Sequence, residues 1–119
     1  MPEFIRYETR DRVAVLTLDN PPVNALAEGV REGVLAGVQR AAADTGVGAV
    51  VLIGAGTTFV AGADIKVFDT IPSIDASLER SRRIHQLLIS VEDSPKPLVA
   101  AIHGNAFGGG LELAMACHF

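Results

Sequence analysis

The chain has 119 residues, 49% of them hydrophobic, and a formal net charge of −4 at pH 7. This length fits one domain or part of one, and it is sufficient to bury a core. The negative charge argues against a surface that binds nucleic acid or anionic membranes in general, and the single cysteine, Cys117, excludes an internal disulfide framework.

The start of the chain predicts a β-hairpin. Residues 4–8 and 12–18 show the apolar alternation that is typical of strands, and Thr9-Arg10-Asp11 between them suits a turn. Pro21 and Pro22 should end this sheet, because proline has no N–H to donate to a neighbouring strand. We expect no signal peptide, because this part of the chain is acidic and lacks a long apolar run.

A long helix is predicted from Leu26 onward, because apolar residues then recur with the spacing of one helix face: Val30, Val34, Leu35 and Val38. Gly29, Gly33 and Gly37 fall at four-residue intervals in the same helix. Each glycine costs about 1 kcal/mol relative to alanine in a helix interior. We therefore expect a flat helix face on which another element packs closely.

Strands and helices alternate over the rest of the chain. Residues 47–54 form a short apolar run that is typical of a fully buried strand, and residues 98–102 form another. One helix is expected between these strands and one after them. This order predicts an α/β fold in which right-handed crossovers connect the later strands.

The two later helices have different end signals. The first should begin at Ser73 or Asp75, either of which can cap it, and should end near Glu92. The last should begin near Gly109 and continue through apolar residues to Phe119, without a glycine to end it. The apolar side of the first is predicted to consist of Ile74, Leu78, Ile84, Leu88 and Val91.

Each of the later strands ends in a glycine-rich loop, residues 54–64 and the triplet Gly108-Gly109-Gly110. Glycines let backbone N–H groups face a ligand without side chains in the way. Phe59 replaces the third glycine of a dinucleotide-binding fingerprint, and Gly110 stands where a phosphate-binding loop needs lysine. Two such loops at the ends of neighbouring strands can instead direct two amides at one oxygen, as in an oxyanion hole.

Glu112 follows the glycine triplet and has two interpretations. As an acid in the first turn of a helix it would interact favourably with the helix dipole, by about 0.3–1 kcal/mol. Its apolar neighbours instead suit a carboxylate that points into an apolar pocket, where desolvation would prepare it to act as a general acid or base. Both interpretations stay open.

No segment predicts membrane insertion or a metal site. The longest apolar stretch, residues 49–53, is far shorter than the roughly 18 residues of a membrane-spanning helix. His85, His103 and His118 lack the spacing of metal ligands. We expect a soluble intracellular protein, cytoplasmic or, in a eukaryote, peroxisomal or organellar.

Three parts of the sequence resemble signatures of the crotonase (enoyl-CoA hydratase/isomerase) superfamily. Residues 59–66 (FVAGADIK) resemble its F-x-A-G-A-D-I-K loop, and residues 20–26 (NPPVNAL) resemble its N-P-x-x-N-A-L segment. Residues 96–104 (KPLVAAIHG), followed by residues 108–114 (GGGLELA), are similar to its second signature. The match covers the whole chain and the first half of a crotonase domain, and it looks most like the hydratase part of multifunctional β-oxidation proteins.

The resemblance implies a partial crotonase-type fold of repeated ββα units that binds acyl-CoA as its small-molecule substrate. It implies that the amides of Ala63 and Gly109 bind the thioester oxygen, and that Glu112 is one of two acids that activate water and transfer protons. The implied reaction is hydration of trans-2-enoyl-CoA to 3-hydroxyacyl-CoA in fatty acid β-oxidation. Enoyl-CoA isomerase or other crotonase-type chemistry, and a non-catalytic acyl-CoA-binding or assembly module, are the alternatives.

Coenzyme A, as part of the substrate, is the only cofactor that the resemblance implies. For Asp64 a loop-capping role, and for Lys66 a solvated surface role, stay open. In the implied site, Lys66 meets a CoA phosphate, and Val23, Asn24 and Ala25 lie along the pantetheine. Ala61, Asp64 and Ile65 lie around the adenine. The glycines Gly62, Gly108 and Gly110 supply the remaining CoA and substrate contacts.

The second catalytic acid that the resemblance implies would lie beyond Phe119. We therefore expect residues 1–119 to be the N-terminal part of a crotonase-like acyl-CoA-binding domain, truncated before that acid. A fused 3-hydroxyacyl-CoA dehydrogenase in the parent protein is compatible with the resemblance. The Gly29/Gly33/Gly37 face, the apolar last helix and the missing second half should together leave uncovered apolar surface, so we expect the chain to self-associate. Its own hydratase activity should be negligible because Glu112 lacks its partner acid.

Overall fold

The computed structural model describes residues 4–61 and 73–119. The predicted α/β class is confirmed, and two short strands that were not predicted are added to it. In chain order the elements are β1 (Ile5–Arg10), β2 (Val13–Leu18), α1 (Glu28–Ala43), β3 (Ala49–Gly54), β4 (Val60–Ala61), α2 (Ile74–Glu92), β5 (Leu98–Ala101), β6 (Ala106–Phe107) and α3 (Gly109–Ala116).

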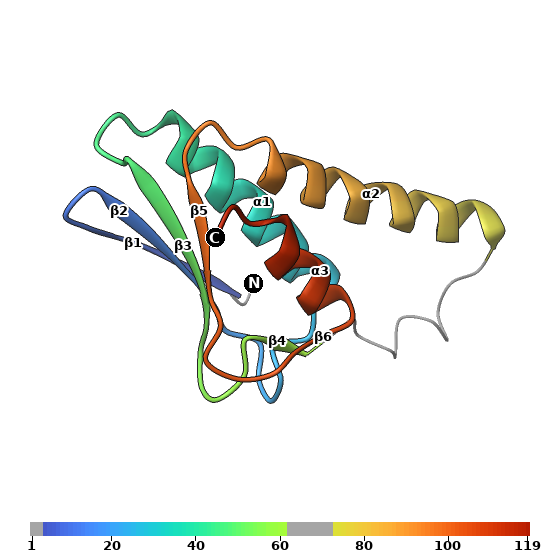
Figure 1. Ribbon diagram of the computed structural model, residues 1–119. Coiled ribbons are helices and arrows are strands. Elements are labelled where there is room, and N and C mark those ends of the chain that lie inside the picture. The colour runs from blue at the N-terminus through green and yellow to red at the C-terminus, as the bar shows by residue number, and fades with distance from the viewer. Residues whose placement is uncertain (1–3, 62–72) are drawn as a thin grey trace.

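The main sheet has the strand order β1-β2-β3-β5. β1 and β2 are antiparallel, whereas β2, β3 and β5 are parallel to one another. Figure 1 shows the three labelled helices on the same side of this sheet. The core lies between them, where Leu16 of β2 and Leu52 of β3 are fully buried together with Val30 and Val34 of α1.

The hairpin forms, but its turn lies later than predicted. β1 continues to Arg10, which pairs with Val13, so the turn residues are Asp11 and Arg12 and not Thr9-Arg10-Asp11. Their φ angles are 47° and 72°. Two consecutive residues with positive φ form the type of turn whose twist matches that of the flanking strands.

The predicted flat face of α1 is confirmed. A Cβ atom added to Gly29 would lie 2.8 Å from the Phe4 ring, and one added to Gly37 would lie 3.0 Å from Leu16. At Gly33 the Cβ would come within 2.5 Å of Ile5 Cγ1. The glycines therefore let α1 pack closely on the hairpin, which covers this face, so it is not part of the uncovered apolar surface to which it was expected to contribute.

The other end of α1 is closed by Lys96, which lies in the turn before β5. Its Nζ donates to the carbonyl oxygens of Ala41, at 2.6 Å, and Asp44, at 2.5 Å. The last carbonyls of a helix lack N–H donors within the helix, and a cation placed there also interacts favourably with the helix dipole. Lys96 thus couples the end of α1 to the start of β5.

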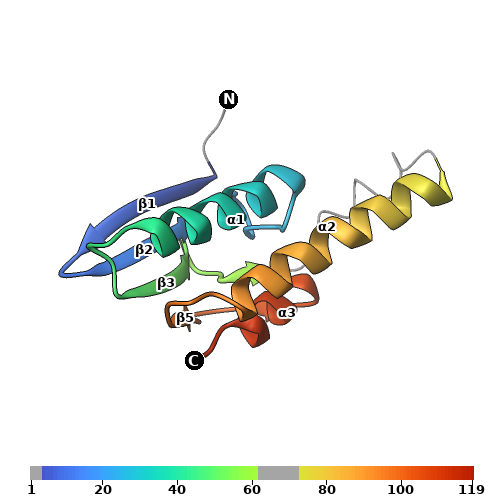
Figure 2. The same cartoon turned by 90° about the horizontal axis from the view of Figure 1, so that it is seen from above.

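The predicted apolar side of α2 is only partly correct. Ser73 does cap the helix, because its Oγ accepts the N–H of Ala76 at 3.1 Å. The buried residues, however, are Leu87 and Val91, whereas Ile74 is 80% exposed. Only the C-terminal half of α2 packs on the body of the protein, and its N-terminal half extends past the sheet (Figure 2). No helix in the described ranges has the length and apolarity to span a membrane.

The last helix ends earlier than predicted, at Ala116 and not at Phe119. The following residues run beside β5: the His118 N–H donates to the Leu98 carbonyl at 2.9 Å, and the Phe119 carbonyl accepts from Ala100 at 2.9 Å. The His118 ring accepts the Leu98 N–H at Nδ1. Backbone groups at the edge of β5 thus find partners that a continued helix would leave unpaired.

One face of the main sheet has no helix of the described chain on it (Figure 1). Its residues are only partly buried and are mostly apolar: Val13, Val15, Thr17, Ala49, Val51, Ile53, Val99 and Ala101. Contiguous apolar patches larger than a few hundred Å² are rare on monomeric proteins. This face is the strongest reason to expect self-association.

We predict that the 119-residue chain associates with copies of itself through this face. Light scattering should give an apparent mass that rises with concentration in the micromolar range. Val51→Lys, at the centre of the face, should suppress the increase, because association would desolvate the lysine. The matched control is Ile89→Lys on α2, where the side chain is 55% exposed. A concentration-independent monomer, or equal effects of both variants, would contradict the prediction.

Candidate active site

The two glycine-rich loops lie side by side at one end of the main sheet. β4 and β6 pair in parallel, with Val60 opposite Ala106 and Ala61 opposite Phe107. α3 starts two residues after Phe107, at Gly109. The end of β4 and the first turn of α3 therefore lie close together (Figure 1).

Five of the predicted site residues lie outside the described residues: Gly62, Ala63, Asp64, Ile65 and Lys66. Their roles stay predictions. The described residues that were predicted to contact substrate come from two places, the segment after β2 and the first turn of α3.

The three glycines before and in α3 serve different purposes. Gly108 has φ 51° and ψ −120°, a conformation that favours glycine, and it turns the chain into the helix. A Cβ on Gly110 would collide with the carbonyl of Val60, so this glycine lets α3 contact β4. Gly109 has room, since an added Cβ would lie 3.5 Å from Leu26 Cδ2. As the first residue of α3, Gly109 has an N–H without an acceptor inside the helix.

Asn24 is the most constrained residue of the region. It is 2% exposed and has φ 54°. Its Nδ2 donates to the carbonyls of Thr58 at 2.9 Å, Ala55 at 3.0 Å and Phe59 at 3.2 Å. Its Oδ1 accepts the N–H of Asn20 at 2.9 Å. The segment that was predicted to lie along the pantetheine thus contains the side chain that holds the loop between β3 and β4.

The rest of segment 20–26 contacts both glycine-rich loops. The carbonyl of Val23 accepts the N–H of Ala61 at 3.0 Å, and Leu26 packs beside Gly109. Within the segment, Asn20 Nδ2 donates to the carbonyl of Ala25 at 3.0 Å. Val23 keeps 41% of its surface exposed, so its side chain is available to a ligand.

Glu112 is exposed, so the chain as described does not hold this carboxylate in an apolar pocket. The buried face of α3 consists of Gly110 and Leu113. Neighbouring residues of a helix are about 100° apart around its axis, which turns Glu112 away from that face. The interpretation that fits this geometry is an acid in the first turn, close to the N-terminal end of the helix dipole.

Sequence reasoning missed one buried charge and one loop contact. Arg31 in α1 is 7% exposed, and its Nη1 donates to the carbonyl of Leu26 at 2.8 Å. Burial, followed by the nearby charge of Arg80, lowers its pKa. His103 Nε2 lies 2.9 Å from the carbonyl of Gly56 and so bridges two loops. In the sequence, Arg31 is a single arginine in a predicted helix, and nothing there indicates that it is buried or which group it bonds.

Two further observations concern reactive groups. Burial raises the pKa of Cys117 to about 11, so its thiol is protonated at neutral pH and is not a nucleophile there. In the part of the chain that the structure describes, no group of three or more His, Cys, Asp or Glu side chains could hold a metal ion. The described residues of the site include the first amide of α3, at Gly109, and the exposed carboxylate of Glu112.

The fold is of the α/β class, and its two glycine-rich loops meet at the N-terminus of α3. The profile of the enoyl-CoA hydratase/isomerase family matches residues 8–119. The chain belongs to this family.

Relatives and solved structures agree with this assignment. The chain is 47% identical over 106 residues to a "Probable enoyl-CoA hydratase" of Bacillus subtilis, covering 89% of this chain and 41% of that one. It is 45% identical over 115 residues to the "Peroxisomal bifunctional enzyme" of Danio rerio, covering 96% of this chain and 15% of that one. A crystal structure of an enoyl-CoA hydratase/carnithine racemase from Magnetospirillum magneticum has 34% identity and a TM-score of 0.93, over 100% of this chain and 46% of that one. The chain thus spans less than half the length of these proteins.

We predict that Asn24→Gly destabilises the chain and loosens the loop between β3 and β4. Glycine tolerates the φ of 54°, so the variant removes the side-chain hydrogen bonds without adding strain. Leaving buried carbonyls unpaired should lower the free energy of unfolding by about 1–3 kcal/mol. Urea denaturation measures this change.

The matched control is Asn105→Gly. Asn105 is exposed in the neighbouring loop, and it holds Phe59 through its backbone carbonyl, at 3.1 Å, which the substitution keeps. An Asn24→Gly variant as stable as the control would show that the contacts of Asn24 do not hold the loop.

Proposed function

We propose that this chain carries the thioester-binding part of an enoyl-CoA hydratase, with the oxygen of an acyl-CoA held by the amides of Ala63 and Gly109. The observation that carries the proposal is the parallel pairing of β4 with β6, which ends at Ala61 and Phe107. Ala63 and Gly109 each follow two residues later in the sequence. Membership of the enoyl-CoA hydratase/isomerase family supports the same substrate class.

The two amides would act on charge that develops during the reaction. When water adds to the β-carbon of a trans-2-enoyl thioester, electron density moves onto the carbonyl oxygen. Fixed N–H donors stabilise that oxyanion, and the positive end of the α3 dipole adds to the effect. When the α-carbon takes up a proton, the oxygen becomes a neutral carbonyl oxygen again, and the addition of one water across the double bond is complete.

Glu112 is the proposed acid/base of this part of the site. Its carboxylate would accept a proton from the water that attacks the β-carbon, or deliver a proton to the α-carbon. It stands three residues after Gly109, in the first turn of α3. That spacing puts it within one turn of the proposed thioester amide.

Coenzyme A would extend from the thioester along segment 20–26. Val23 and Ala25 would contact the pantetheine, and Lys66 would contact a phosphate. The adenine end would be contacted by Ala61, Gly62, Asp64 and Ile65. Gly108 and Gly110 would support the amide between them. The peroxisomal relatives are named bifunctional or multifunctional enzymes, which supports a parent protein that also carries a fused 3-hydroxyacyl-CoA dehydrogenase.

A second candidate function is acyl-CoA binding without chemistry. The exposure of Glu112 favours it, because an exposed carboxylate has no environment that prepares it for proton transfer. Absorbance of crotonyl-CoA separates the two candidates, since hydration consumes its conjugated double bond whereas binding does not. Enoyl-CoA isomerase chemistry would use the same amides and would appear as conversion of a 3-enoyl thioester.

The test of the proposed function is Gly109→Pro, with Gly109→Ala as its control. Proline removes the N–H and is well tolerated at the first position of a helix. Alanine keeps the N–H, and its Cβ would have ordinary van der Waals contact with Leu26. We expect Gly109→Pro to weaken crotonyl-CoA binding by up to about tenfold, the value of one hydrogen bond, and to lower any hydration rate by about 10²–10³.

Calorimetry with crotonyl-CoA and with free CoA measures the binding effect. The loss should be specific to the thioester, and Gly109→Ala should bind like the wild type. Equal affinities of the wild type and Gly109→Pro for crotonyl-CoA would remove the Gly109 amide from the proposed site.

A further inference from the structure

We propose that Arg31 is a positioning residue of the acyl-CoA site: it fixes the backbone of Leu26, and Leu26 fixes the position of Gly109. The functional meaning of this role rests on the proposed function. The contacts themselves lie among described residues and can be tested without a ligand.

The first contact joins Arg31 to the end of segment 20–26. The guanidinium turns back toward the start of α1 and donates from Nη1 to the carbonyl of Leu26 at 2.8 Å. Only 7% of the residue is exposed. A hydrogen bond from a buried cation is stronger than one between neutral groups, and desolvation makes the loss of such a partner costly. The Leu26 carbonyl is therefore held firmly.

The second link places Leu26 next to the first residue of α3. The Leu26 side chain is 3% exposed, and its Cδ2 would lie 3.5 Å from a Cβ added to Gly109, so it neighbours the residue that carries the proposed thioester amide. A buried leucine in a close-packed interior follows its own backbone. A shift of the Leu26 carbonyl would therefore change the packing at the first residue of α3, where the Gly109 N–H lies.

Arg31 and Asn24 connect segment 20–26 to different parts of the fold. Asn24 connects the segment to the loop between β3 and β4, whereas Arg31 connects it to α1. The orientation of the Gly109 amide thus depends on α1 as well as on the two glycine-rich loops. This dependence could not be read from the sequence, where Arg31 is one charged residue among several in α1.

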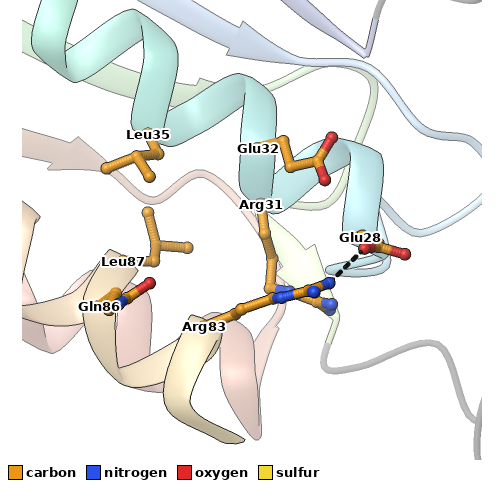
Figure 3. Close-up of a pocket in the computed structure, with 7 residues that line it drawn as sticks. All are labelled: Glu28, Arg31, Glu32, Leu35, Arg83, Gln86 and Leu87. Atoms are coloured by element: carbon orange, nitrogen blue, oxygen red, sulfur yellow. Dashed lines mark hydrogen bonds and ion pairs between the residues drawn. The ribbon is translucent and has the colours of Figure 1, made fainter. Parts of the chain in front are cut away.

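The surroundings of Arg31 supply a matched control. Figure 3 shows Arg31 between α1 and α2, in a cavity of about 250 Å³ that Glu28, Arg83 and Leu87 also line. Arg83 donates to Glu28 at 2.8 Å, but both side chains are more than half exposed. Arg83 therefore lines the same cavity, while its ion pair lies at the surface and does not involve Leu26.

The experiment compares four variants of the 119-residue chain by NMR without ligand. Arg31→Met removes the donor and keeps much of the side-chain length, and Arg31→Lys keeps a donor. We expect Arg31→Met to move the amide resonance of Gly109, because the Leu26 side chain next to it would shift. Arg31→Lys should restore part of this change.

The two controls are Arg83→Met and Lys96→Met. The first changes the same cavity, and the second removes the cation at the opposite end of α1, which donates to Ala41 and Asp44. Neither should move the Gly109 resonance. If Lys96→Met moves it as much as Arg31→Met does, the effect of Arg31 is general stability and the proposal is wrong.

A folded Arg31→Met chain with an unchanged Gly109 resonance would also overturn the proposal. The same samples titrated with crotonyl-CoA should show weaker binding for Arg31→Met, with free CoA binding as to the wild type. If the wild type binds no crotonyl-CoA, the proposed function fails, while the ligand-free Gly109 measurement still decides the role of Arg31.

Discussion

The side-chain amide of Asn24 is the interaction on which the site depends. It reaches three carbonyls of the loop between β3 and β4, and its oxygen accepts the N–H of Asn20. The carbonyls of Thr58 and Phe59 are buried, and leaving them without this donor would cost about 1–3 kcal/mol each. The φ of 54° adds a second requirement, because asparagine adopts positive φ more readily than most residues. Few side chains meet both conditions.

This constraint matters because the proposed chemistry uses backbone amides. A side chain can change rotamer to meet a ligand, whereas an amide lies where its backbone lies. Segment 20–26 binds Ala61 through the Val23 carbonyl and contacts Gly109 through Leu26. At Gly104 an added Cβ would collide with the carbonyl of Thr57, and at Gly110 with that of Val60, so the two loops approach one another at distances that only glycine permits. Hydrogen bonds and glycine contacts together fix the two amide-bearing loops.

Local signals allowed much of the fold to be predicted from the sequence. The period of the apolar residues, the Ser73 cap and the spacing of Gly29, Gly33 and Gly37 all depend on nearby residues. The buried face of α2 depends on what packs against it, so Leu87 was missed and the exposure of Ile74 was not foreseen. The glycine-rich loops were visible, but the partners of Asn24 lie 31 to 35 positions away. Arg31 was missed because nothing in the sequence distinguishes a buried arginine from the solvated ones around it.

The most direct test of the central claim is to follow the amide resonances of Ala63 and Gly109 while the chain is titrated with crotonyl-CoA and, separately, with free CoA. If two loops direct their amides at one thioester oxygen, both resonances should move with crotonyl-CoA along the same saturation curve. Neither should move by a comparable amount with free CoA, which has no acyl oxygen. A response from only one amide, or equal responses to both ligands, would contradict the account.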